Sequence, residues 1–153
     1  MSGDSRHPGL DRSRRGVLLL CVAVFGLASC KDETEGRLPV FPVTGSVLQK
    51  ELPAFGAIVT FHPLDPAVPA AIRPNAQVEV DGTFRLTTYE AGDGAPAGEY
   101  AVTVFWPKPP QSPVDAPDSG PDRLQGRFAD PERSSLRVSV PKAATELEPF
   151  RID

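Results

Sequence analysis

The sequence predicts an all-β protein, an antiparallel, seven-stranded β-sandwich with Greek-key connections. Three observations favour this fold. Apolar and polar residues alternate with a period of two from Val43 onward, which is the pattern of strands with one buried face. Clusters of Gly, Pro, Asn and Asp separate the alternating runs, and the 153 residues include 18 prolines and 13 glycines. No run beyond residue 43 has the period of a helix, so the sequence predicts a core built from strands.

Seven runs carry the alternation, at residues 43–48, 57–62, 76–80, 84–87, 100–106, 136–140 and 146–152. In the first two runs the small or apolar residues are odd-numbered. In the next two the inward residues are even-numbered, from Ala76 to Val80 and then at Phe84 and Leu86. Asp81-Gly82 lies between these two runs and predicts a β-hairpin with a type I′ turn, in which both central residues have positive φ.

The fifth run is the predicted central strand, with its even-numbered residues on one face. Tyr100 follows Gly98 as in a tyrosine corner, where the hydroxyl bonds a nearby backbone group. The last run is less regular, and Pro149 indicates an edge strand because it cannot donate a ladder hydrogen bond. Inward parity on separate strands predicts a core, shared by both sheets, that contains Phe61, Phe84, Leu86, Val102, Val104 and Val138.

The N-terminal 29 residues have the pattern of an export signal. Arginines precede an apolar segment, residues 16–27, that is shorter than the roughly 20 residues needed to span a bilayer. The segment ends in Leu27-Ala28-Ser29-Cys30, which resembles the lipobox of bacterial lipoproteins. This resemblance implies cleavage between Ser29 and Cys30 and acylation of Cys30, for example with palmitate. Residues 13–18 also resemble a twin-arginine signal, so the export route stays open.

Cys30 therefore determines the predicted domain organisation. A signal peptide spans residues 1–29, a tether spans 30–42, and a β-sandwich domain spans 43–153 with a proline-rich loop at 107–121. Two acyl chains give stable anchoring, so the lipid bilayer is the first predicted partner, reached through Cys30. The residue after Cys30 is a lysine. By resemblance to lipoprotein sorting this implies an exported protein at the outer membrane or its periplasmic face, with the inner membrane as the alternative.

Composition narrows the classes of partner. The formal net charge is −4, and it becomes −6 once the four arginines and two aspartates of residues 1–29 are removed. A negative chain argues against nucleic acid or anionic lipid as a partner, because both need clustered Lys and Arg to neutralise phosphate. Cys21 leaves with the signal and Cys30 carries lipid, so the mature chain has no disulfide and must be stabilised by packing.

Four segments occur in a specific order: VTGSV at 43–47, GAIVTFHP at 56–63, DGTFRLTT at 81–88 and PAGEYAVTV at 96–104. Together they resemble the strands of the carboxypeptidase regulatory-like modules, transthyretin-like sandwiches that occur in small bacterial lipoproteins. The sequence departs from that family at 49–55, which lacks the usual glycine turn before a proline, and in its long proline-rich loop. The resemblance implies a fold and no activity, because catalysis in metallocarboxypeptidases belongs to a separate domain.

The residues available for chemistry predict no enzyme, no metal site and no cofactor. His62 is the one histidine that remains after cleavage, and a zinc site needs further nitrogen or thiolate ligands at a fixed spacing. Ser134 and Ser135 could in principle join a Ser-His-Asp arrangement, but neither lies on a recognisable nucleophile elbow. We expect His62 to be solvated or hydrogen-bonded to the backbone.

The segment 123–131 is the most informative part outside the predicted strands. Leu124 and Phe128 are expected to pin the preceding loop onto the sandwich, while Arg123 and Arg127 are candidate binding residues for a carboxylate or an acidic glycan. Trp106 is assigned to the core. The sequence thus predicts a membrane-anchored, non-catalytic structural or interaction module of the cell envelope. Alternatives are a glycan- or peptide-binding module, and an accessory subunit of an envelope enzyme or transporter.

Overall fold

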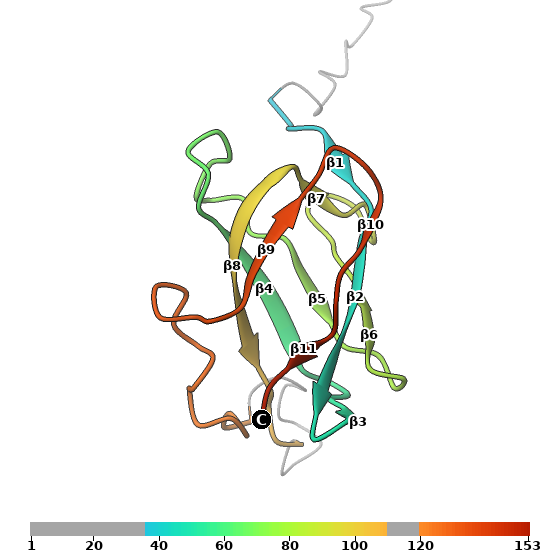
Figure 1. Ribbon diagram of the computed structural model, residues 1–153, viewed down its shortest axis with the longest axis vertical. Helices are drawn as coiled ribbons and strands as arrows, with labels where there is room; N and C mark the ends of the chain where they lie inside the picture. Colours follow the sequence, from blue (N-terminus) through green and yellow to red (C-terminus); the bar gives the residue numbers. More distant parts are fainter. Residues whose placement is uncertain (1–35, 110–119) are drawn as a thin grey trace, which may run out of the picture. The chain divides into compact units, whose positions relative to one another are not determined.

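The computed structural model describes residues 36–109 and 120–153, and these form an all-β domain (Figure 1). We call residues 36–153 the β domain. Its strands are β1 (Val40–Phe41), β2 (Val43–Gln49), β3 (Leu52–Pro53), β4 (Ile58–Pro63), β5 (Asn75–Gln77), β6 (Thr83–Arg85), β7 (Ala95–Pro96), β8 (Gly98–Phe105), β9 (Arg137–Val140), β10 (Thr145–Glu146) and β11 (Phe150–Arg151). The all-β prediction is confirmed. Eleven short segments in the described part replace the seven longer strands that were predicted.

One layer is a regular antiparallel sheet in the order β5-β4-β8-β9. Its longest ladder joins β4 to β8, with Val59 opposite Val104 and Phe61 opposite Val102. The predicted interior position of the fifth run is confirmed, because β8 pairs with β4 on one edge and with β9 on the other. Residues 100–104 of β8 are buried on both faces.

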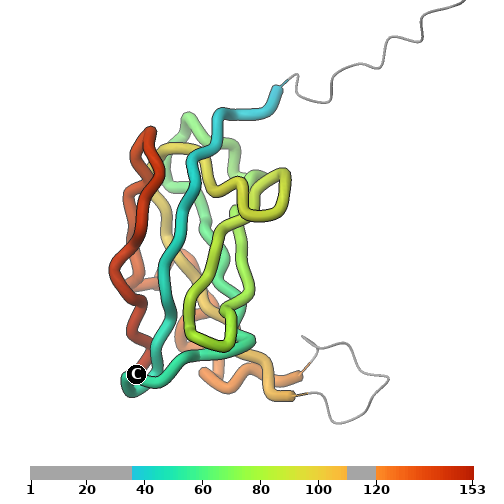
Figure 2. Tube along the Cα trace, turned by 90° about the vertical axis from the view of Figure 1, so that its right-hand side faces the viewer, coloured from blue at the N-terminus to red at the C-terminus, as the bar shows by residue number. Residues whose placement is uncertain are grey.

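The other layer is assembled around β2, as Figure 2 shows from the side. β6 and β3 pair with it in antiparallel register, whereas β10 and β11 pair with it in parallel. The prediction of a wholly antiparallel fold is therefore wrong. The last predicted strand is divided because Pro149 lies between β10 and β11, where it offers no ladder donor.

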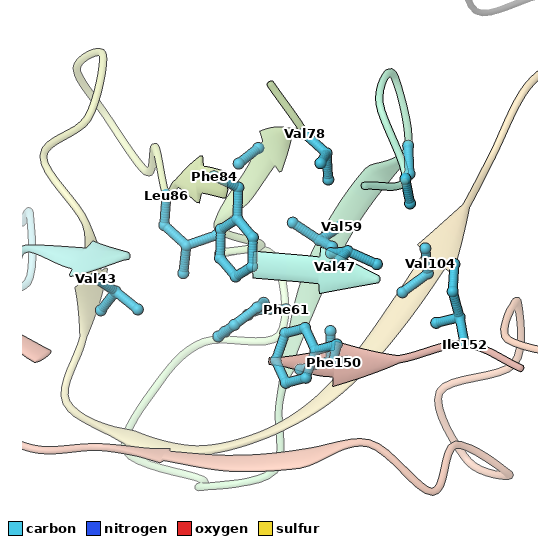
Figure 3. Close-up of a cluster of buried hydrophobic side chains, with 14 of the residues drawn as sticks. Val43, Val47, Val59, Phe61, Val78, Phe84, Leu86, Val104, Phe150 and Ile152 are labelled. Atoms are coloured by element: carbon cyan, nitrogen blue, oxygen red, sulfur yellow. The ribbon is translucent and has the colours of Figure 1, made fainter. Parts of the chain in front are cut away.

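Side chains from both layers meet in one core (Figure 3). Phe150 connects the layers: its ring stacks on Phe84 at 5.9 Å and lies 6.3 Å from Phe61. Of the predicted core residues, those buried are Phe61, Phe84, Leu86, Val102 and Val104. The prediction that Val138 is buried is wrong, because this residue of the edge strand β9 is only partly buried. Trp106 is 7% exposed, so its assignment to the core is confirmed.

The turn at Asp81-Gly82 differs from its prediction. Gly82 donates its N–H to Glu79 O at 2.9 Å, and of the Asp-Gly pair Gly82 alone has positive φ, at 87°. This is a turn followed by a glycine in the left-handed region, and the type I′ prediction is wrong. The predicted hairpin itself is present, because Glu79 N–H donates to Thr83 O at 2.7 Å and Asn75 forms an antiparallel bridge with Thr87. Between these two points β5 pairs with β4 while β6 pairs with β2. Val80 lies in the turn and is 75% exposed, which corrects its predicted inward position.

A type I′ turn forms instead between β2 and β3. Lys50 and Glu51 have φ of 49° and 64°, and the flanking residues Gln49 and Leu52 pair with each other. Both central residues therefore adopt a conformation that favours glycine or asparagine, which costs about 1 to 2 kcal/mol per residue for other side chains. The tight turn before Pro53 is present although the sequence provides no glycine there.

The β domain begins before the predicted boundary at residue 43. β1 pairs with β7, and the N–H of Leu38 donates to the hydroxyl of Tyr89 at 3.1 Å. Part of the predicted tether, residues 36–42, is thus attached to the domain. The predicted tyrosine corner is confirmed, because the Tyr100 hydroxyl donates to Pro96 O at 2.8 Å.

Candidate functional site

The β domain has two ends, which the strand directions define. The proximal end carries the first described residues, from Gly36, together with β1, β7 and the β4–β5 loop (Figure 1). The distal end carries the β2–β3 turn, the β5–β6 turn and the C-terminal end of β8. β8 spans the distance between the ends with eight residues, or about 25 Å at the usual rise of a strand.

Three large apolar side chains are exposed at the distal end: Leu52 at 68%, Phe55 at 60% and Val80 at 75%. We call these three residues the apolar tip. Their segments are in direct contact, because the Gly56 N–H donates to Val78 O at 2.9 Å and Pro53 lies against Gly82. Scattered exposed apolar residues are ordinary, whereas several at one end of a domain make that end a candidate for an interaction surface.

The tip is joined to the first of the two predicted binding arginines. Trp106 donates its indole N–H to Phe55 O at 2.9 Å, and the guanidinium of Arg123 lies 4.0 Å from the centre of the Trp106 ring. The indole is buried beneath this stack while Arg123 is exposed. A cation over an aromatic face is held in place, so Arg123 presents a fixed positive charge beside the tip.

Arg127 has a different set of contacts. Its Nη1 donates to the backbone oxygen of Asp153 at 2.9 Å, and its guanidinium lies 5.6 Å from the ring of Phe128. Leu124 is 2% exposed and Phe128 packs against the core, so the predicted pinning of this segment is confirmed. The structure gives Arg123 and Arg127 separate partners.

Asp122 organises this end of the domain, and sequence reasoning missed it. Its carboxylate accepts three backbone hydrogen bonds, from the N–H groups of Trp106 at 3.1 Å, Leu124 at 3.0 Å and Gly126 at 2.8 Å. The spacing Asp122 to Leu124 is that of an Asx turn, which was the available signal. The bond from Lys108 N to Pro121 O, at 3.0 Å, closes the neck of the proline-rich loop. Residues 110–119 of the predicted loop lie outside the described residues.

Residues from the C-terminal strand support the turn that carries Leu52. The backbone N–H of Lys50 donates to Asp153 Oδ1 at 2.6 Å, and Arg151 forms an ion pair with Glu51. Backbone in sparsely populated φ regions persists where its surroundings hold it, and such positions gather at functional sites. The β2–β3 turn meets the first description, because Asp153 and Arg151 hold it.

His62 lies away from the tip and has a structural environment. Its Nε2 is 2.9 Å from the hydroxyl of Thr103, and the same hydroxyl donates a long bond, 3.5 Å, to Thr60 O. The pKa of His62 is lowered, first by burial and then by the positive charge of Arg73. The predicted backbone bond to this imidazole is replaced by a side-chain bond. Across residues 36–109 and 120–153, no three His, Cys, Asp or Glu side chains are grouped as metal ligands.

A cavity of about 730 Å³ forms an open groove on the side of the domain between β5 and β6. Polar and charged residues dominate its lining, among them Gln77, Glu79, Arg85 and Glu146. Charges of both signs and wide access to solvent indicate a hydrated surface. The apolar tip is the more distinctive feature.

Ser29 and Cys30, the predicted cleavage and lipidation residues, lie outside the described residues. The described strands and loops include no helix of the length and hydrophobicity needed to span a membrane. The chain matches no protein-family model, no curated protein and no solved structure. The arrangement of its own residues is therefore the basis for assigning a function.

Proposed function

We propose that this chain is a lipid-anchored protein of the cell envelope whose β domain, a non-catalytic sandwich related to the carboxypeptidase regulatory-like modules, acts as an interaction module. One observation carries the proposal: the chain enters the domain at one end, and its apolar tip lies at the other. A tether at the proximal end leaves the tip free to reach a partner. The lipobox at Leu27–Cys30 supports the anchor, through acylated Cys30.

The partner is a protein of the envelope. The apolar tip joins two aliphatic side chains to one aromatic ring, and Arg123 on its tryptophan lies beside it. Protein interfaces favour such a combination of apolar anchors with an arginine at the edge. A glycan platform would present paired aromatic faces, whereas Phe55 is the one exposed aromatic residue in the described ranges. The tip therefore favours a role as an accessory subunit over a role in glycan binding.

The anchor and the tip are tested separately. Mass spectrometry of the native protein should detect an acylated N-terminal Cys30 and no residues 1–29, and Cys30→Ser should release the domain from the membrane. An intact N-terminus in the mature protein would contradict the anchor.

For the tip, a photo-cross-linking residue is placed in cells at Phe55, at Val80 and, as a matched control, at Gln77. Gln77 is exposed on β5 but lies outside the tip. The account predicts one protein adduct shared by positions 55 and 80 and none at 77. Equal labelling at all three positions would contradict a specific surface.

A further inference from the structure

The proximal end carries an apolar loop between β4 and β5, residues 64–72. In Figures 1 and 2 this loop lies at the same end of the domain as β1, where the described chain begins. Asp65 is the one charged residue among the nine, and the others are Leu, Pro, Ala, Val and Ile. Leu64 is 48% exposed, and the loop also exposes Pro66, Ala67, Pro69, Ala70 and Ala71.

The loop is held in one conformation by its own bonds. Leu64 N–H donates to Glu99 O at 2.8 Å, and Val68 N–H donates to Asp65 O at 3.0 Å. The Asp65 carboxylate accepts the N–H of Ala67 at 2.8 Å. Val68 is 5% exposed and packs over Gly98, where a side chain would meet it at 3.4 Å. The N–H groups of Ala67, Val68 and Ile72 are thus bonded within the loop, which lowers the cost of placing them in a weakly hydrated environment.

An apolar pocket of about 300 Å³ adjoins the loop. Leu38 and Phe41 from the N-terminal segment line it together with Val68 and Ala97. Lys142 stands at its edge, and Arg73, whose Nε donates to Ala70 O at 3.3 Å, ends the loop. Apolar residues flanked by basic side chains match the layers of a bilayer surface, where acyl chains lie below phosphate groups.

We infer that the loop 64–72 and the adjoining pocket rest on the bilayer that holds the anchor. This inference depends on the proposed acylation of Cys30. Five residues lie between Cys30 and Gly36, and the six steps from one residue to the other reach at most about 20 Å in an extended chain. The anchor thus keeps the proximal end close to the lipid surface and away from bulky partners. The stable anchor raises the local concentration of the weaker contact at the loop, and the domain stands with its apolar tip directed away from the bilayer.

Site-specific fluorescence tests this orientation on the full mature protein. Cys21 and Cys30 are the only cysteines, and the first is removed while the second is acylated. Leu64→Cys, Ala70→Cys and, as a control, Val80→Cys therefore each introduce a single thiol. All three side chains are exposed, so labelling should leave the fold intact. Each is labelled with a polarity-sensitive dye and reconstituted into vesicles of phosphatidylcholine that contain nitroxide-labelled lipid.

The expected result is strong quenching at 64 and 70, at least about two-fold, as for side chains at the headgroup boundary, with no quenching at 80. Protein that floats with the vesicles but shows equal fluorescence at all three positions would overturn the inference and leave the anchor standing. Protein that does not float would remove the anchor and the inference with it.

Discussion

The middle of the β domain and its distal end use the same types of side chain in opposite ways. Val78 is 1% exposed, and Val80, two residues further along the same segment, is 75% exposed. Phe84 is 2% exposed and stacks on Phe150, whereas Phe55 is 60% exposed. In each pair the buried residue lies in or beside a strand, and the exposed residue lies in a turn. Apolar residues in the middle form the fold, and those at the distal end are available to a partner.

The largest expected difference in stability is between the alanine variants of Phe84 and Phe55. Phe84→Ala should lower the free energy of unfolding by about 3 to 5 kcal/mol, because it leaves a cavity beneath Phe150. Phe55→Ala removes an exposed ring and should cost less than about 0.5 kcal/mol. Urea denaturation of the two variants measures both values. A similar loss in both variants would show that Phe55 belongs to the core and would end the contrast.

The next largest effect is expected from removing the hydroxyl of Tyr100, which lies in the middle of the β domain. Tyr100→Phe leaves Pro96 O without its buried donor, so the variant should lose about 1 to 3 kcal/mol. The same urea titration detects it. A loss of less than about 0.5 kcal/mol would mean that the corner is not structural.

Tyr100 also predicts a dependence on pH. Burial, then the charge of Asp65, raises the pKa of Tyr100 from 10.0 to about 12. The unfolded chain releases this proton near pH 10 and the folded domain holds it to higher pH, so stability is complete below pH 10 and falls as pH rises toward 12. Thermal unfolding between pH 9 and 12 measures the loss, and Tyr100→Phe should reduce its slope. An identical slope in the variant would contradict the raised pKa.

A smaller effect, a gain in stability instead of a loss, is expected from changes in the β2–β3 turn. Lys50→Asn combined with Glu51→Gly places favourable residues in the left-handed region and should stabilise the domain by about 1 kcal/mol. The exposed pair between Glu51 and Arg151 is lost, but such pairs contribute less than about 1 kcal/mol. Calorimetry measures the gain. A lower melting temperature would show that the turn depends on these side chains.

The smallest expected effect concerns residues 110–119. The bond from Lys108 to Pro121 already brings the ends of this segment together. Replacement by four Gly and Ser residues should change stability by less than about 1 kcal/mol, because the closure entropy varies slowly with length. The melting temperature of the shortened protein checks this. Unfolding many degrees lower would place the segment in the fold.

The alternation of apolar and polar residues predicted the positions of all seven runs that become strands, because the face of a strand on which a residue lies follows from its immediate sequence. Two-residue strands such as β1 and β7 carry no detectable period. The turn types could not be read locally, since Asp81-Gly82 joins strands of different layers and Lys50-Glu51 lacks glycine. The inward position predicted for Val80 was wrong for the same reason, because the alternation of the strand does not continue into the turn.

The site was predicted in part. The segment 123–131 was singled out, and Arg123 does lie beside the tip, on Trp106. The tip itself combines Leu52 of β3, Phe55 shortly after it and Val80 of the β5–β6 turn, and only the pairing of β2 with β3 and β6 brings them to one end. A sequence read one segment at a time shows three unremarkable apolar residues.

The most direct test of the account measures cross-linking and stability in the same protein. A photo-cross-linking residue replaces Leu52, in the native background and in the background Phe55→Ser with Val80→Ser. The account predicts an envelope-protein adduct in the native background and a loss of at least about ten-fold in the variant, as expected when interface anchors are removed. Stability should stay within about 1 kcal/mol, because all three residues are exposed. An undiminished adduct, or an unfolded variant, would contradict the claim that the distal end serves recognition and the middle serves the fold.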